Sequence, residues 1–408
     1  MSTSHAGPSS GPREAPAGSP AVVLRGTLGL AVAMGLGRFF YTPVLPLMVA
    51  ALNWGTGPSA WIATANYAGY FLGCLAVARG WLRPSSALLR VGLLSTAVLL
   101  ALVALSGEPL WQASVRLAAG VASGLVFVCI TQRIPQVARR PHDAGLVYAG
   151  VGTGILASGA LVLAVGGAVG WRGLWLLCAG LSALLSVFAW NWSMAGPRAR
   201  GHETADRAVV ERRSSEASDA PVPDDETPGS RPDGMLQLSV GYFCQGAGYI
   251  IIGTYLVVLA EPVFGATAAA ATWLVAGAAT APSPLLWSLV AARIGLRRAL
   301  AVCYGLQVLG AVLAIFASAP VLLLAAAALF GATFMGVTMM TIGVGTQLGS
   351  PVAAAELTTW YSLGQIAGPA LVAAVLSGTI MGSFIVAAIA LAAGMALSLL
   401  GARAAQAR

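Results

Sequence analysis

Long apolar segments recur along this chain and constrain its fold more than any other feature. Crossing the ~30 Å hydrocarbon layer of a membrane takes about 20 helical residues. In lipid such segments must be helices, because an open strand would leave backbone groups unpaired. The sequence therefore predicts an all-α membrane protein with twelve transmembrane helices. These lie near 22–50, 60–78, 86–106, 109–132, 144–167, 171–193, 235–260, 266–290, 297–318, 320–345, 353–378 and 380–402.

Composition supports a membrane protein over a soluble one. Only 9% of the 408 residues are charged and 58% are hydrophobic, whereas soluble domains carry about 25% charged residues. A chain this apolar has too little polar surface to cover itself in water, so its apolar faces are expected to contact lipid.

The predicted helices form two groups of six, separated by a polar segment. We expect a disordered cytoplasmic tail at 1–20, an N-terminal six-helix bundle at 21–193, a flexible cytoplasmic linker at 194–234 and a C-terminal six-helix bundle at 235–408. The linker is rich in Pro, Ser and charged residues, which is typical of disorder. A regulatory role for it stays open, but it is too short for a folded signalling domain, which argues against a membrane sensor.

Weak internal repetition indicates that the two bundles are pseudo-symmetric. Gly35–Arg38 aligns with Gly246–Tyr249 at an offset of 211 residues. An acidic residue also precedes a tyrosine by five positions in both halves, as Asp143 and Tyr148 and then as Glu356 and Tyr361. The second match has an offset of 213 residues. Because the two offsets are nearly equal, we expect a duplicated six-helix unit.

The basic residues predict the orientation. All of them are arginines, and short loops on one side of the predicted membrane hold nine of them: Arg79, Arg83, Arg90, Arg133, Arg139, Arg140, Arg293, Arg297 and Arg298. The opposite short loops hold Arg172. Cytoplasmic loops carry the excess of Arg and Lys, so both termini are predicted to be cytoplasmic, in a bacterial inner membrane. Because these arginines form loop clusters and no continuous stripe, nucleic acid is not expected as a partner.

Residues that could hold a metal or perform catalysis are scattered. The five cysteines stand singly in apolar runs, and the three histidines lie in predicted loops. We therefore expect no metal, no cofactor and no enzymatic activity. The sequence also lacks lysine, so it cannot form an ATP-binding loop of the type GxxxxGK[ST].

Two arginines are predicted to lie deep in the membrane. Arg38 is about 14 residues into the first predicted helix, a depth of about 21 Å, and Arg116 is about 10 Å from the outer end of the fourth. A lipid-facing Arg at a helix centre costs about 2.5–3.5 kcal/mol. Both are therefore candidates for an anion-attracting cavity. The alternative is that one or both donate to backbone carbonyls or extend toward the membrane surface.

Other polar residues are candidates for substrate contact or for helix movement. The stretch Gly35–Met48 contains Arg38, Tyr41, two glycines and two prolines, which predict a kinked helix. Gln245 and Tyr249 lie on the helix that matches the first one and are candidate substrate contacts. Glu356 is a candidate coupling carboxylate, with capping or an ion pair as the alternative. Asp143 is expected to cap the helix at 144–167.

These features resemble the major facilitator superfamily. The loop Arg293-Ile-Gly-Leu-Arg297-Arg298 is similar to the basic gating motif of that family, whereas the matching loop after the second helix has Ala78 where the family often has Asp. The blocks Gly35–Met48, Asn66–Gly73, Gly246–Ile252 and Gly364–Pro369 resemble the YbfB/YjiJ-type branch. The resemblance implies that the first, fourth, seventh and tenth helices line a central cavity. Arg38, Arg116 and Tyr249 would then face that cavity.

The function expected from the residues and from the resemblance is secondary transport by alternating access. The expected substrate is a small organic anion attracted by Arg38. Substrate contacts are expected from Arg38, Tyr41, Arg116, Gln245 and Tyr249, and coupling or gating from Asp143, Glu356, Arg293, Arg297 and Arg298. We expect a monomer in a lipid bilayer with a coupling ion such as H⁺. The alternative is efflux of drugs or metabolites by the same fold.

Overall fold

The computed structural model describes residues 19–54, 56–192, 234–264, 266–316, 319–375 and 380–406. Nearly all of the predicted tail at 1–20 and of the predicted linker at 194–234 lies outside these ranges. The described elements are all helical: α1 (Pro20–Leu30), η1 (Ala31–Leu36), α2 (Tyr41–Leu52), α3 (Thr56–Ala78), α4 (Ser86–Val103), α5 (Pro109–Val137), α6 (Asp143–Ala189), α8 (Met235–Phe264), α9 (Ala266–Thr280), α10 (Ser283–Ile294), α11 (Leu296–Ile315), α12 (Pro320–Gln347), α13 (Ala353–Val375) and α14 (Ile380–Gln406).

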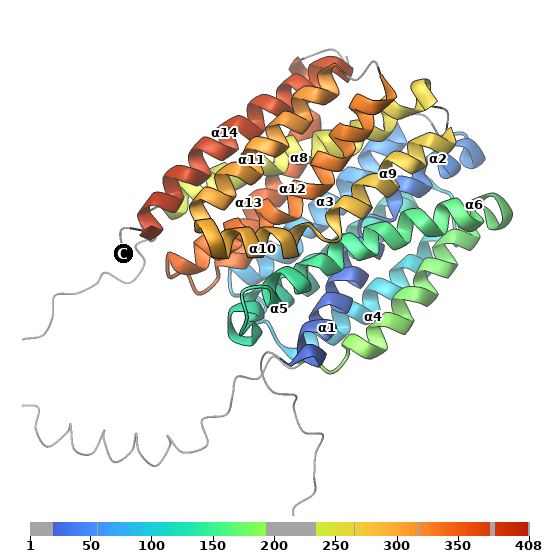
Figure 1. Cartoon of the computed structure of the whole chain (residues 1–408). Helices are drawn as coiled ribbons and strands as arrows, with labels where there is room; N and C mark the ends of the chain where they lie inside the picture. Colours follow the sequence, from blue (N-terminus) through green and yellow to red (C-terminus); the bar gives the residue numbers. More distant parts are fainter. Residues whose placement is uncertain are drawn as a thin grey trace, which may run out of the picture.

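Within the described ranges, ten helices are long and apolar enough to cross a membrane. One of these is α6, whose 47 residues contain a reversal at Gly170, where φ is +62°. Glycine adopts this backbone conformation without the steric cost that other residues meet. Figure 1 shows α6 doubling back on itself. Counting α6 as two crossings and α13, with 23 residues, as one more is compatible with the twelve crossings predicted from the sequence.

The first predicted helix is kinked at the position of Arg38. It consists of α1, the π-helical turn η1 and α2, with residues 37–40 in a turn between η1 and α2. Gly37 N donates to Val32 O and Phe39 N donates to Met34 O, which is the wide i→i−5 pattern of a π-helix. Pro43, in the first turn of α2, cannot donate to Phe39 O, which instead accepts from Thr42 N. The predicted kink is therefore present.

The packing of helices repeats between the two halves of the chain. In the N-terminal half α4 packs against α5 and α6, and in the C-terminal half α11 packs against α12 and α14. Figure 1 shows the N-terminal helices on one side of the molecule and the C-terminal helices on the other. This arrangement agrees with two pseudo-symmetric bundles.

The main contacts between the halves, which we call the seam, join α3 to α13, and α6 to α9 and α10. The contact between α6 and α9 is close enough to require a glycine on α6. A Cβ atom on Gly152 of α6 would lie 2.3 Å from Ala281 N, the backbone nitrogen that follows α9. Away from the seam, large apolar residues such as Leu94, Val98 and Phe188 are exposed, as expected for surfaces that face lipid.

Candidate substrate-binding site

Arg38 lies at the seam, in the turn between η1 and α2, and is only 2% exposed. Its guanidinium carbon is 3.9 Å from the centroid of the Tyr70 ring and 5.4 Å from that of Tyr67, both on α3. From the other half, Gln365 on α13 accepts a hydrogen bond from Arg38 Nη2 through its side-chain oxygen. Arg38 therefore connects the two halves directly.

The guanidinium of Arg38 is only partly satisfied. Its Nε and Nη1 atoms are buried and have no hydrogen-bond partner among the described residues. Within the same ranges no salt bridge to Arg38 occurs, and the one salt bridge found joins His142 and Asp143. A charged donor buried without a partner costs more than the roughly 1–3 kcal/mol of a neutral one.

Arg116 on α5 is equally buried, at 2% exposed, but it makes different contacts. Its Nη1 donates to Gly37 O and its Nη2 to Arg38 O, both at 2.9 Å. These carbonyls lie at the break in the first helix, where Thr42 N donates to Phe39 O and not to Arg38 O. Arg116 thus replaces helical donors that the kink removes. These bonds correspond to the backbone-carbonyl alternative considered from the sequence.

Tyr41 and Asn66 support Arg116. The Tyr41 ring centroid lies 5.1 Å from the Arg116 guanidinium carbon, and the Tyr41 hydroxyl donates to Ser59 O at 3.2 Å. Asn66 on α3 donates from its amide to Arg116 O at 2.8 Å. Together these contacts fix the turn that carries Arg38 against α3 and α5.

An aromatic cluster extends from Arg38 into the C-terminal half. We call it the seam aromatic cluster, and it consists of Phe39, Tyr242, Tyr249, Trp273, Phe330, Phe334 and Tyr361. Phe39, the residue after Arg38, lies 6.2 Å from Phe334 between ring centroids. The Tyr249 ring lies 5.3 Å from Phe330, 5.0 Å from Phe334 and 5.7 Å from Tyr361. Tyr249, a predicted contact, is therefore placed within rings at the seam.

The backbone of Gln245, the other candidate on α8, packs closely against α14. Its backbone nitrogen lies 3.2 Å from the place where a Cβ on Gly394 of α14 would stand. Its side chain is fully buried, and neither amide atom has a hydrogen-bond partner among the described residues. The structure shows no contact between Gln245 and Arg38.

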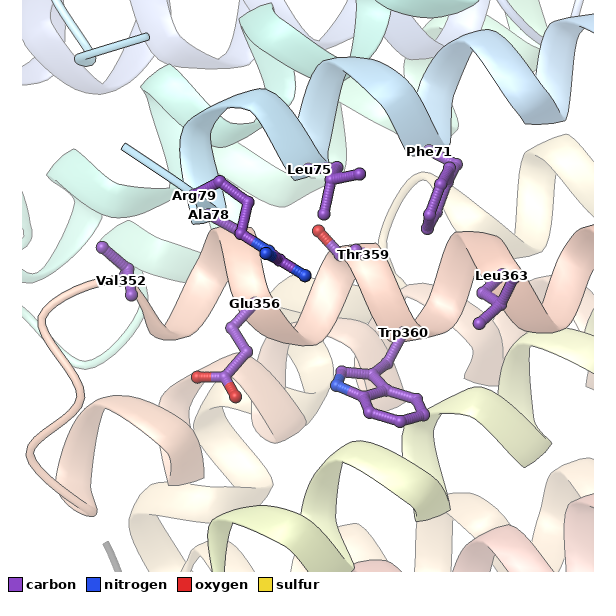
Figure 2. Close-up of a pocket in the computed structure, with 9 residues that line it drawn as sticks. All are labelled: Phe71, Leu75, Ala78, Arg79, Val352, Glu356, Thr359, Trp360 and Leu363. Carbon is purple, nitrogen blue, oxygen red and sulfur yellow. The ribbon is translucent and has the colours of Figure 1, made fainter. Parts of the chain in front are cut away.

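A pocket of about 390 Å³ lies between α3 and α13. Figure 2 shows the Arg79 side chain reaching from the end of α3 toward α13, and Glu356 and Thr359 projecting from α13. At its other end the pocket is lined by Phe71 and Leu363. These residues are close in sequence to Tyr70 and Gln365, so the pocket runs along the two helices that hold Arg38.

Asp143 has a role different from the predicted helix cap. The residue at the N-cap of α6 is His142, and it makes no side-chain capping bond. Asp143 Oδ2 instead accepts from Arg139 N at 2.8 Å and Arg140 N at 2.9 Å, in the preceding loop. The expectation that Asp143 caps the helix is thus wrong, because the loop before α6 turns back and offers its own N–H groups to the carboxylate.

The basic loop between α10 and α11 lies at the end of the molecule. Arg293 occupies the last turn of α10 and Arg298 the first turn of α11, and both are exposed. Arg297 is partly buried. None of these three residues lies in the pocket that contains Arg79 and Glu356.

Sequence reasoning did not select Gln365 and Tyr70 as site residues, although they contact Arg38. The sequence could have indicated Gln365, because it is an amide within an apolar segment that also contains a Gly–Pro pair. Tyr70 has no such signal beyond its block Asn66–Gly73. No group of three or more potential metal ligands occurs within the described ranges.

Multiple apolar helices, packed as two similar halves, define a multi-pass membrane protein. The model of one protein family, described as "Uncharacterised MFS-type transporter YbfB", matches residues 30–403. The chain belongs to this family, which confirms the resemblance to the major facilitator superfamily and to its YbfB-type branch. A search of curated proteins finds no match.

Proposed function

We propose that this protein is a secondary transporter that carries a small organic anion across the bacterial cytoplasmic membrane by alternating access. The observation that carries the proposal is the Arg38 guanidinium, which is buried at the seam with two nitrogens, Nε and Nη1, unpartnered among the described residues. A carboxylate forms charge-assisted hydrogen bonds with such a group at about 2.7–2.9 Å. The substrate would pair with Arg38 between the two halves.

The hydrogen bond from Arg38 to Gln365 gives this binding a route to conformational change. A carboxylate that engages the guanidinium competes with Gln365 for the same positive group. Loss of that bond would loosen one contact between the halves, so substrate binding and seam opening would be coupled. The pocket between α3 and α13 is the proposed route toward Arg38 from the end that carries Arg79.

The proposed orientation places both termini and the Arg79 end in the cytoplasm, on the basis of the arginine distribution. The absence of an ATP-binding loop from the sequence supports transport driven by an ion gradient or by the gradient of the substrate itself. Glu356 is the proposed coupling carboxylate, since it lines the pocket with Arg79. Asp143 and the arginines 293, 297 and 298 are proposed to act in gating, through the loops they occupy.

Replacing Glu356 with Gln tests the coupling: uptake driven by a pH gradient is expected to fall, while exchange of substrate across the membrane persists.

Replacing Arg38 with alanine is expected to reduce uptake of the accepted anion at least 100-fold. Losing a charge-assisted partner in a dry site costs about 3 kcal/mol, or about two orders of magnitude. The measurement is initial uptake into proteoliposomes, screened over organic anions, cations and sugars. Arg172→Ala is the matched control, because Arg172 is exposed. Acceptance of cations alone, or full activity of Arg38→Ala, would overturn the proposal.

Efflux of an amphipathic compound is the second candidate. The seam aromatic cluster favours it, because stacked rings accommodate apolar bodies of many shapes. Deletion of the gene would then sensitise cells to drugs, and the purified protein would show no carboxylate flux.

A further inference from the structure

The contacts of the second buried arginine limit the charge of the substrate. Arg116 directs both of its Nη atoms to backbone carbonyls, and its Nε has no partner among the described residues. Arg133, which is also buried, donates to Gln136. Arg38 is therefore the arginine that offers two unpartnered N–H-bearing nitrogens at the seam. A second carboxylate there would remain without a matching cation in a low-dielectric interior, which is strongly unfavourable.

The groups around Arg38 restrict the shape and chemistry of the nonpolar part of the substrate. Stacking on Tyr70 covers a face of the guanidinium and leaves the N–H groups at its edge, where a planar carboxylate binds. Tyr361 precedes Gln365 by four residues, so both side chains lie on one face of α13. Tyr361 consequently lies one helical turn from Gln365, which accepts the hydrogen bond of Arg38. The Tyr361 ring is tilted by 35° against that of Tyr249, with 5.7 Å between the ring centroids.

Ring geometry places the cluster beside Arg38. The Arg38 guanidinium carbon lies 5.8 Å from the centroid of the Phe39 ring, and the Phe39 ring lies 6.2 Å from that of Phe334. Ring centroids within the cluster are separated by 4.7 to 6.4 Å. This is the range that aromatic pairs prefer. A further ring could exchange with these partners as the halves separate and lose little stacking energy.

We propose that the Arg38 site takes an aromatic monocarboxylate. Its carboxylate pairs with Nε and Nη1 of Arg38, and its ring stacks among Tyr249, Phe334 and Tyr361. This inference rests on the proposed function and narrows its substrate class. Each ring contact is expected to contribute a preference of about 2- to 10-fold over a saturated ring of the same size.

The test is competition and uptake in proteoliposomes that contain the full chain, with Arg38→Ala liposomes as the background for passive leakage. Radiolabelled benzoate is the probe. Cyclohexanecarboxylate, terephthalate and benzamide compete as the saturated, doubly charged and neutral analogues. We expect benzoate to be preferred at least threefold over cyclohexanecarboxylate, and terephthalate and benzamide to compete at least tenfold more weakly.

A variant of the cluster separates ring recognition from anion recognition. Tyr249→Leu is expected to remove the preference for benzoate, so that the ratio of benzoate uptake to cyclohexanecarboxylate uptake falls to about one. Phe188→Leu is the matched control, because Phe188 is an exposed aromatic residue away from the seam. If Tyr249→Leu does not fold, the competition series on the parent protein still decides the question.

The outcomes distinguish the two proposals. Arg38-dependent transport of an aliphatic carboxylate or a dicarboxylate in preference to benzoate would overturn the aromatic monocarboxylate and leave the anion transporter standing. Failure of every carboxylate to be transported would overturn the proposed function itself, and this inference with it.

Discussion

Replacing Arg116 with methionine is expected to destabilise the protein by about 2–5 kcal/mol. The substitution keeps much of the side-chain volume but removes the donors to Gly37 O and Arg38 O. Those carbonyls lie inside the protein at the break between η1 and α2, where regular helical donors are missing. Each buried carbonyl left without a partner costs about 1–3 kcal/mol. The measurement is the apparent melting temperature of the purified protein in detergent, followed by tryptophan fluorescence.

Arg38→Met is the matched control for this prediction, because the two arginines are equally buried. It removes one hydrogen bond to Gln365 and two unpartnered donors, so stability is expected to change by less than about 1 kcal/mol. Transport, in contrast, is expected to be lost in Arg38→Met. If Arg38→Met were the more destabilising of the two, Arg38 would be a structural residue and its assignment as the anion site would fail.

Replacing Gly152 with valine is expected to reduce transport at least tenfold by keeping the two halves apart. A Cβ there would meet Ala281 N at 2.3 Å, a distance that backbone atoms can avoid only if α6 and α9 separate. The close contact of α6 with α9 seen here would then be unavailable, and the proposed alternating access requires the protein to pass through it. Gly167→Val, on the same helix with no atom near the added Cβ, is expected to transport normally.

The displacement can be measured directly with spin labels on Pro141→Cys and Ala292→Cys, two exposed positions in different halves. Cys244 is replaced by serine in this background, since the other four cysteines are buried. The distance distribution between the labels is expected to shift to longer values in Gly152→Val and to stay unchanged in Gly167→Val. An unchanged distance distribution in both variants, with normal transport, would show that the contact between α6 and α9 tolerates the valine side chain.

The sequence was sufficient to predict those features that depend on one segment at a time. Helix positions follow from apolar length, and the kink follows from the glycines and prolines around Arg38. The burial of Arg38 and Arg116 follows from the cost of charge in hydrocarbon. Each of these predictions is matched by the structure, because each depends on the local chain and the solvent around it.

The features that sequence could not supply depend on which helices meet. Gln365 faces Arg38 because α13 packs beside α3, and an amide in an apolar segment is equally compatible with any neighbouring helix. For Arg116 the sequence left open a cavity or backbone carbonyls, and only the position of the kinked turn shows that carbonyls lie within its reach. The alignment selected Gln245 as a substrate contact but could not show that its backbone packs against Gly394 of α14.

The most direct measurement is a structure of the protein with bound 4-bromobenzoate, in which anomalous scattering locates the bromine. We predict one bromine site within the seam aromatic cluster and a carboxylate within about 2.7–2.9 Å of Nε or Nη1 of Arg38. A bromine bound only elsewhere, for example between Arg79 and Leu363, with those two nitrogens of Arg38 still unpartnered, would contradict the assignment of Arg38 as the anion site.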